Sequence, residues 1–151
     1  MSKIYLGADH RGFKLKEVIK SYLTSLKVSY EDLGAFKLDQ NDDYPDFAAK
    51  VAAKVATEKS RGILICGSSI GICILANKYK GVYAAPVTNE MDAKLSIEHN
   101  NANVICLSGW NLSAVKAKKI IRVWLKTDYK VVVRHGRRLE KIKKIENINF
   151  K

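Results

Sequence analysis

The sequence has few of the residues that would divide a fold into parts. Only two prolines occur among 151 residues, and no Gly/Ser-rich or low-complexity tract interrupts the chain. No run of about 18 apolar residues and no leader-like segment are found, which argues against membrane spanning and secretion. With 47% hydrophobic and 28% charged residues, disorder and collagen-like repeats are also poor interpretations. We therefore expect a single domain over residues 1–151.

Cysteine is scarce as well. The three cysteines, Cys66, Cys73 and Cys106, are an odd number and form no CxxC pair. Reduced thiols in a cytoplasmic protein fit this pattern best. Because the cysteines show no metal-ligand spacing, we expect no structural metal.

Acidic residues are lacking in the last quarter of the chain. Residues 114–151 hold thirteen Lys and Arg against three Asp and Glu, so this stretch carries 13 − 3 = +10 of the net 27 − 15 = +12. Such an excess favours an anionic partner, which could be nucleic acid, a membrane surface or a phosphorylated small molecule. No aromatic stacking motif or base-reading element accompanies the charge, so we expect neither a nucleic acid nor a membrane partner.

Short apolar runs alternate with stretches in which apolar residues recur at helical spacing. The expected strands are residues 3–8, 28–33, 62–66, 82–87 and 103–107. The expected helices are residues 12–27, a segment from Pro45 through Val55, a segment from the turn at 66–71 to about 80, residues 91–99, and a segment around 117–124. The alternation predicts an α/β, Rossmann-like domain whose five-stranded parallel sheet is covered by helices on both faces. Leu139, Ile142 and Ile145 give the basic tail a narrow apolar seam, so we expect a helix that docks on the domain.

Ligands of such sheets bind at the carboxyl ends of the strands. That position holds Asp9 and His10 after the first strand and the loop Cys66–Gly71 after the third. Successive backbone amides and a helix dipole in this loop could hold an anion and lower the pKa of the Cys66 thiol, which could then act as a base or a nucleophile. Alternatively, Cys66 is a core residue and the glycines only turn the chain.

Two further groups could bind a substrate. His99 adjoins Asn100, and Arg134 and Arg138 are four residues apart, so that both arginines share one face if the tail is helical. Two guanidinium groups on one face suit a phosphate dianion. The alternatives without a binding role are that His99 is an incidental surface histidine and that the arginines belong to a solvated basic helix.

Five motifs in order carry a resemblance that spans nearly the whole chain. They are GADHRGFKLKE at 7–17, DYPDFA at 43–48, GILICGSSIGICILANK at 62–78, IEHNNANV at 97–104 and RHGRRLEKI at 134–142. With these motifs the chain resembles the ribose-5-phosphate isomerase B family, which shares its fold with the galactose-6-phosphate isomerase subunits.

The resemblance implies a role for each candidate residue. Cys66 would be the base that moves a proton between C1 and C2 through a cis-enediolate, and Ser68 would lie near the reacting oxygens. The loop amides would stabilise the oxyanion, and His99 would help to open the sugar ring. The remaining implied contacts are sugar binding by Asp9, His10 and Asn100, phosphate binding by Arg134 and Arg138, and the oxyanion amides of Gly67, Ser69, Ile70 and Gly71. The resemblance further implies a homodimer with shared active sites, or a tetramer formed by two such dimers, and no metal or organic cofactor.

The chain departs from the family pattern at several positions. Ser69 replaces a glycine of the loop, and this would cost about 1–2 kcal/mol if the position needs a positive φ. Tyr83, Ile97 and Trp110 stand where arginines are usual, and Ile72 stands where some members carry a carboxylate base. The Cys66 and His99 pair survives these changes.

The expected function is interconversion of D-ribose 5-phosphate and D-ribulose 5-phosphate in the non-oxidative pentose phosphate pathway. Two alternatives stay open at this point. One is isomerisation of another phosphosugar, such as a hexose 6-phosphate, and the other is a homologue that binds a phosphosugar without turnover.

Overall fold

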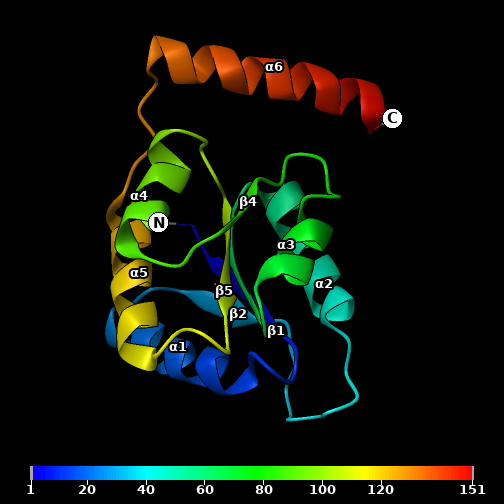
Figure 1. The fold of residues 1–151 in the computed structure, drawn as a ribbon, viewed down its shortest axis with the longest axis vertical. Coiled ribbons are helices and arrows are strands. Elements are labelled where there is room, and N and C mark those ends of the chain that lie inside the picture. The colour runs from blue at the N-terminus through cyan, green and yellow to red at the C-terminus, as the bar shows by residue number, and fades with distance from the viewer. Residues whose placement is uncertain (1, 151) are drawn as a thin grey trace.

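A five-stranded parallel sheet forms the centre of the computed structural model, which describes residues 2–150. The strands are β1 (Ile4–Ala8), β2 (Tyr30–Asp32), β3 (Arg61–Cys66), β4 (Ala84–Pro86) and β5 (Val104–Ser108), in the order β2-β1-β3-β5-β4. The helices are α1 (Phe13–Ser25), α2 (Tyr44–Glu58), α3 (Ile70–Ala76), α4 (Glu90–Glu98), α5 (Ala114–Lys126) and α6 (Val133–Asn149). A helix follows every strand, which confirms the predicted α/β, Rossmann-like fold (Figure 1).

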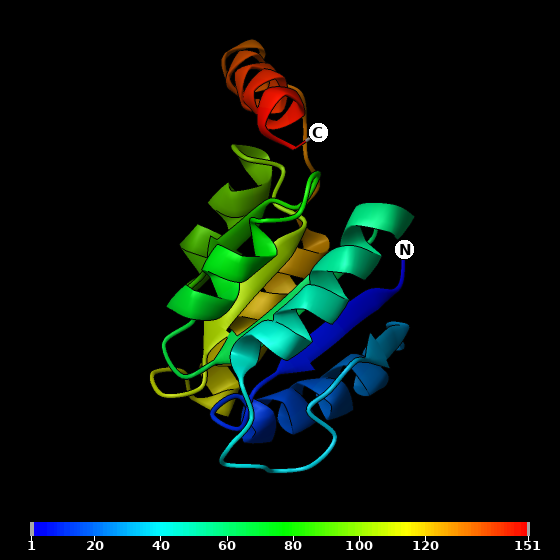
Figure 2. The same cartoon turned by 90° about the vertical axis from the view of Figure 1, so that its right-hand side faces the viewer.

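Helices cover both faces of the sheet (Figure 2). Alternate strand residues point to opposite sides, so Ile4 and Leu6 pack with α1, α4 and α5, while Tyr5 and Leu64 pack with α2 and α3. Burial on both sides explains why β3 and β5 are almost continuously apolar. Cys73 and Cys106 are buried in the α2–α3 layer, as expected of core residues.

β2 covers only Tyr30–Asp32 of the expected strand 28–33, and two further elements are also shorter than the sequence indicates. β4 covers only Ala84–Pro86, and α3 ends at Ala76 and not near Lys80. The Asn77 side chain explains both limits, because its amide oxygen accepts from the Ala84 N–H at 2.9 Å and its amide nitrogen donates to the Ala84 carbonyl at 2.9 Å. The side chain thus joins the end of α3 to the start of β4.

The basic helix α6 lies across the amino end of the sheet, outside the two helical layers (Figures 1 and 2). Its Glu146 carboxylate accepts from the Gly81 N–H at 2.6 Å, and the Tyr83 hydroxyl donates to the same carboxylate at 3.3 Å. Of the seam residues, Leu139 is buried, but Ile142 and Ile145 remain 44% and 59% exposed. The predicted docking is therefore confirmed for Leu139 and wrong for the rest of the seam.

Within residues 2–150, no helix has the length and apolar character needed to cross a membrane.

Candidate active site

Loops after β1, β3 and β5 meet at the carboxyl edge of the sheet. The Ser108 hydroxyl donates to the Gly67 carbonyl at 2.6 Å, and the Gly109 N–H donates to the Cys66 carbonyl at 2.8 Å. Gly109 also packs so closely on the β1–α1 loop that a Cβ there would lie 2.1 Å from the Arg11 carbonyl oxygen. The structure thus brings Asp9, His10 and the loop Cys66–Gly71 to one edge, as the sequence predicts.

Cys66 ends β3 and is only 3% exposed. Burial raises the pKa of the Cys66 thiol; hydrogen bonds from the backbone amides of Ile72, Ser69 and Ser68 oppose this rise, and the charge of Asp9 adds to it. The loop amides lower this pKa, as expected, but in the single chain the loss of hydration outweighs them and the net shift is a rise.

The loop between β3 and α3 has the backbone shape that usually requires glycine. Ser69 has a φ of 70° and a ψ of −12°, which is the left-handed region. An L-residue in this region costs about 1–2 kcal/mol. The Ser68 hydroxyl oxygen accepts from the Ile70 N–H at 3.2 Å, and a Cβ at Gly71 would lie 2.5 Å from the ring of Tyr44. The loop beside Cys66 is therefore fixed by local contacts.

Asp9 and His10 are held by separate hydrogen bonds beside this loop. Asp9 Oδ1 accepts from the N–H groups of Arg11 and Gly12 at 2.9 and 3.1 Å. Burial raises the pKa of the Asp9 carboxyl, and these two bonds reduce the rise. His10 is bound by Asp42, whose Oδ1 lies 2.7 Å from His10 Nδ1 and 2.8 Å from the His10 backbone nitrogen. The sequence did not single out Asp42, which is one of several acidic residues in the turn 39–43.

Asp9, His10 and Asp42 each offer an atom within 4.8 Å of the others, which is the spacing of a possible cation site. Their hydrogen bonds do not suit a metal, however. Asp9 Oδ1 already accepts two amides, and the His10 nitrogen nearest the carboxylates is bonded to Asp42. The arrangement fits a hydrogen-bonded histidine better than a ligand set.

Trp110 covers the loop at the position where the resemblance leads one to expect an arginine. Its indole lies so close to Gly67 that a Cβ there would be 2.6 Å from the ring, and the side chain is 64% exposed. The Arg11 guanidinium lies 5.8 Å from the centre of the same ring. Arg11 therefore brings a cation to this edge. The sequence offered only its place directly after Asp9 and His10 as a signal.

The other predicted residues lie at the opposite end of the sheet. His99 follows the last turn of α4, which runs back from the carboxyl end of β4, and its ring stacks on His135 of α6 with centroids 4.1 Å apart. Arg134 and Arg138 are exposed on α6, and Asn100 is exposed beside His99. Since the six residues of β3 span about 20 Å, a single chain does not bring these residues to Cys66 (Figure 1).

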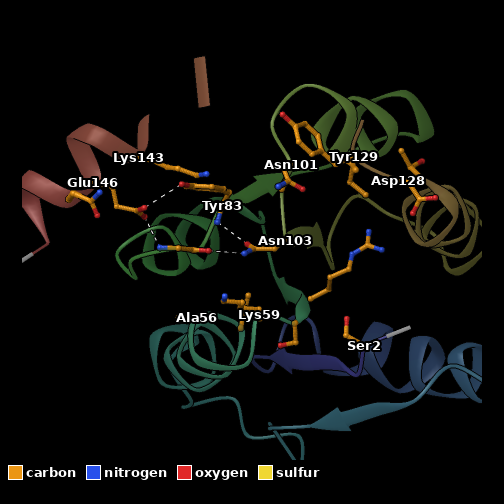
Figure 3. Close-up of a pocket in the computed structure, with 18 residues that line it drawn as sticks. Ser2, Ala56, Lys59, Tyr83, Asn101, Asn103, Asp128, Tyr129, Lys143 and Glu146 are labelled. Atoms are coloured by element: carbon orange, nitrogen blue, oxygen red, sulfur yellow. Dashed lines mark hydrogen bonds between the residues drawn. The ribbon is translucent and has the colours of Figure 1, made fainter. Parts of the chain in front are cut away.

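Two cavities lie at the amino end of the sheet. One of about 460 Å³ is lined by His99 and His135, and another of about 610 Å³ lies between α6 and the sheet. Figure 3 shows the larger one, in which the side chain of Asn103 bridges the backbone of Tyr83 and Gly81 and Glu146 reaches in from α6. None of the site residues predicted from the sequence lines this larger cavity.

Residues 4–142 match the sequence model of the family described as Ribose/Galactose Isomerase. The chain belongs to this family. It is 44% identical over 145 residues to a probable ribose-5-phosphate isomerase B of Mycoplasma genitalium, with 95% of each chain covered. It is 40% identical over 147 residues to ribose-5-phosphate isomerase B of Escherichia coli, with 97% of each covered.

Solved structures of Ribose/Galactose Isomerase members share the fold. The crystal structure of ribose-5-phosphate isomerase B from Mycoplasma genitalium with bound ribulose-5-phosphate superposes with a TM-score of 0.92 at 43% identity, covering 96% of each chain. The enzyme of Clostridium thermocellum gives a TM-score of 0.92 at 39% identity, covering 97% of this chain and 98% of that one.

Proposed function

We propose that this chain is an aldose–ketose isomerase that interconverts D-ribose 5-phosphate and D-ribulose 5-phosphate, as one domain over residues 1–151, in the non-oxidative pentose phosphate pathway. The observation that carries the proposal is the Cys66 thiol at the carboxyl edge, where the backbone amides of Ser68, Ser69 and Ile72 oppose the rise that burial causes in its pKa. The relative from Mycoplasma genitalium, with ribulose-5-phosphate bound, supports the substrate.

The proposed reaction moves one proton between neighbouring carbons. The Cys66 thiolate takes the proton from C2 of the open-chain aldose. The C2–H electron pair forms the C1–C2 double bond while the C1–O1 π bond breaks and its electron pair moves to O1, which gives a cis-enediolate. The thiol then returns the proton to C1, where the C1–C2 π pair forms the new C–H bond. The proton of O2 is transferred to O1 and the O2–H electron pair forms the C2–O2 double bond, which leaves the ketone at C2. Amides of the loop Gly67–Gly71 would stabilise the negative oxygen, and Ser68 would contact the reacting oxygens. No metal or organic cofactor takes part in this scheme.

The other half of the site would come from a second copy of the chain. His99 would open the ring and Asn100 would bind the sugar, while Arg134 and Arg138 would bind the phosphate; all four lie at the end of the sheet opposite Cys66. A homodimer that sets the amino end of one copy against the carboxyl edge of the other would complete the site. The exposed isoleucines of α6, Ile142, Ile145 and Ile148, support such an interface. The arginines of the second copy would also favour the thiolate of Cys66.

A coupled assay of ribose 5-phosphate isomerisation tests the proposed base. Cys66→Ala should lower kcat by about 100-fold or more, because a positioned base contributes this much or more to proton transfer. The matched control is Cys73→Ala, the same substitution at a buried thiol that donates to the Ala84 carbonyl away from the loop. Full activity of Cys66→Ala would contradict the assignment, and an equal loss in both variants would show damage to the fold.

The substrate is tested by comparing kcat/KM for five- and six-carbon phosphosugars. Trp110 narrows the edge beside Gly67, so the shorter ribose 5-phosphate should be preferred over a hexose 6-phosphate. A preference for the hexose phosphate would favour the first alternative, and binding of both sugars without turnover would favour a non-catalytic role.

A further inference from the structure

The side chain of Asp42, in the loop between β2 and α2, points into the candidate active site. Asp42 belongs to the polar turn 39–43, yet its side chain is only 10% exposed. Burying a carboxylate costs free energy unless hydrogen bonds replace its hydration. The groups that bind Asp42 therefore indicate why it points inward.

Both bonds of Asp42 go to one residue of the site. Oδ1 accepts from the His10 backbone N–H at 2.8 Å and lies 2.7 Å from His10 Nδ1. A carboxylate can only accept, so the hydrogen of this second bond must be on Nδ1. His10 is then held as the Nδ1–H form, and Nε2 is the ring nitrogen left for a ligand.

The second carboxylate oxygen is not used within the described part of the chain. Asp42 Oδ2 is buried and has no hydrogen-bond partner among residues 2–150. The polar groups beside this carboxylate are His10, whose side chain is 16% exposed, and Asp9. If Asp42 served only to hold the loop against the sheet, the bond to the His10 backbone N–H would be enough, and a bond to the His10 ring would not be needed.

We propose that Asp42 is a positioning residue, which fixes the orientation and the Nδ1–H tautomer of His10 so that Nε2 faces the sugar. The inference rests on the proposed function for its substrate, but the link between Asp42 and His10 does not. Asp42 acts through His10 and has no part in the proton transfer by Cys66.

Two substitutions separate the hydrogen bonds from the charge. In Asp42→Asn the amide oxygen can still accept from both His10 N–H groups, whereas Asp42→Ala removes both bonds. Asp42→Ala should lower kcat/KM by about 10- to 100-fold, the usual effect of losing a hydrogen bond to a charged group. Asp42→Asn should stay within about threefold of wild type. Asp39→Asn is the matched control, since it removes one charge from the same turn and keeps an acceptor for the Asn41 N–H.

The tautomer of His10 is measured without substrate, by long-range ¹⁵N–¹H correlation at a pH where the rings are neutral. The chain has three histidines, so a His10→Gln spectrum assigns the signal. His10 should be the Nδ1–H form in wild type, Asp39→Asn and Asp42→Asn, and should shift toward Nε2–H in Asp42→Ala. A merely structural role would lower the melting temperature of Asp42→Ala and leave the tautomer unchanged.

The two measurements distinguish the inference from the proposed function. An active wild type with wild-type kcat/KM in Asp42→Ala would overturn the inference and leave the function standing. A wild type without isomerase activity would overturn the function, and the tautomer would then decide the role of Asp42 alone. An unchanged tautomer in Asp42→Ala overturns the inference in either case.

Discussion

The charge state of Cys66 depends on two opposing contributions at a single sulfur atom. Burial raises the pKa of the thiol and the amides of Ile72, Ser69 and Ser68 lower it, with a net rise. In a single chain without substrate, the thiolate of Cys66 should therefore form only above the ordinary thiol value of about 8.5, whereas the arginines of a second copy would move this midpoint to lower pH. The difference in ultraviolet thiolate absorbance between wild type and Cys66→Ala, recorded against pH, measures this midpoint.

Asp9 provides a directional check on the same titration. The negative charge of Asp9 raises the pKa of Cys66, so Asp9→Asn should move the midpoint to lower pH while its amide oxygen still accepts from Arg11 and Gly12. A midpoint below the ordinary value of about 8.5 in the wild type would mean that the amides, together with the arginines that a second copy brings, outweigh burial.

At the scale of elements, a buried lysine joins α1 to β2. Lys16 is fully buried, and its Nζ lies 2.6 Å from Asp32 Oδ1 and 2.6 Å from the Ala35 carbonyl oxygen. Lys16→Met should reduce the free energy of unfolding by about 3 kcal/mol, because the substitution leaves a buried carboxylate without its main partner. Urea unfolding measures the loss, and Lys14→Met, at an exposed position of the same helix, is the matched control.

The effect of Lys16→Met should also depend on pH. Burial would raise the pKa of Asp32, but hydrogen bonds from Lys16 and Lys20 outweigh it and the pKa is lowered. The ion pair therefore stabilises the fold above the unfolded-state value of about 3.9, and this stability is lost as the pH falls through the lower folded value. The difference between the two variants should shrink below about pH 4. Equal stability of Lys16→Met and Lys14→Met at neutral pH would contradict the prediction.

The sequence predicts the elements well where burial sets a period. Leu15, Ile19 and Leu23 at helical spacing identify α1, and the apolar run of β3 identifies a central strand. The docking of α6 could not be predicted in the same way. A seam at Leu139, Ile142 and Ile145 shows which face of a helix is apolar, but it does not show whether that face meets its own chain or another.

The candidate site also contains residues that the sequence could place and one residue that it could not. Asp9, His10 and Cys66 follow strands, so the rule for carboxyl ends places them together, and the structure agrees. His99 follows a helix and precedes a strand, a signal that places it at the amino end. The sequence did not indicate that Asp42 belongs to the site. Its side chain points inward because it contacts His10, and this contact joins residues that are 32 positions apart.

At the scale of the molecule, the residues with implied roles form two groups at opposite ends of one sheet. The carboxyl edge holds Cys66, the proposed base, and the amino end holds His99 and the arginines of α6. The positively charged helix α6 therefore lies next to the cavity that His99 and His135 line. Under the proposed function, neither group alone is a complete site for a phosphosugar, and each would supply what the other lacks.

A mixed dimer tests whether two copies share their sites. Cys66→Ala and His99→Ala chains, carrying different affinity tags, are produced together, and the dimer that holds both tags is isolated. If each site combines Cys66 of one copy with His99 of the other, the mixed dimer has one intact site and should show about half the wild-type turnover. If each site lies within one chain, both sites of the mixed dimer are defective and its turnover should equal that of the inactive parents. Each parent dimer, isolated through the same two-tag procedure, gives the baseline from which the restored activity is measured.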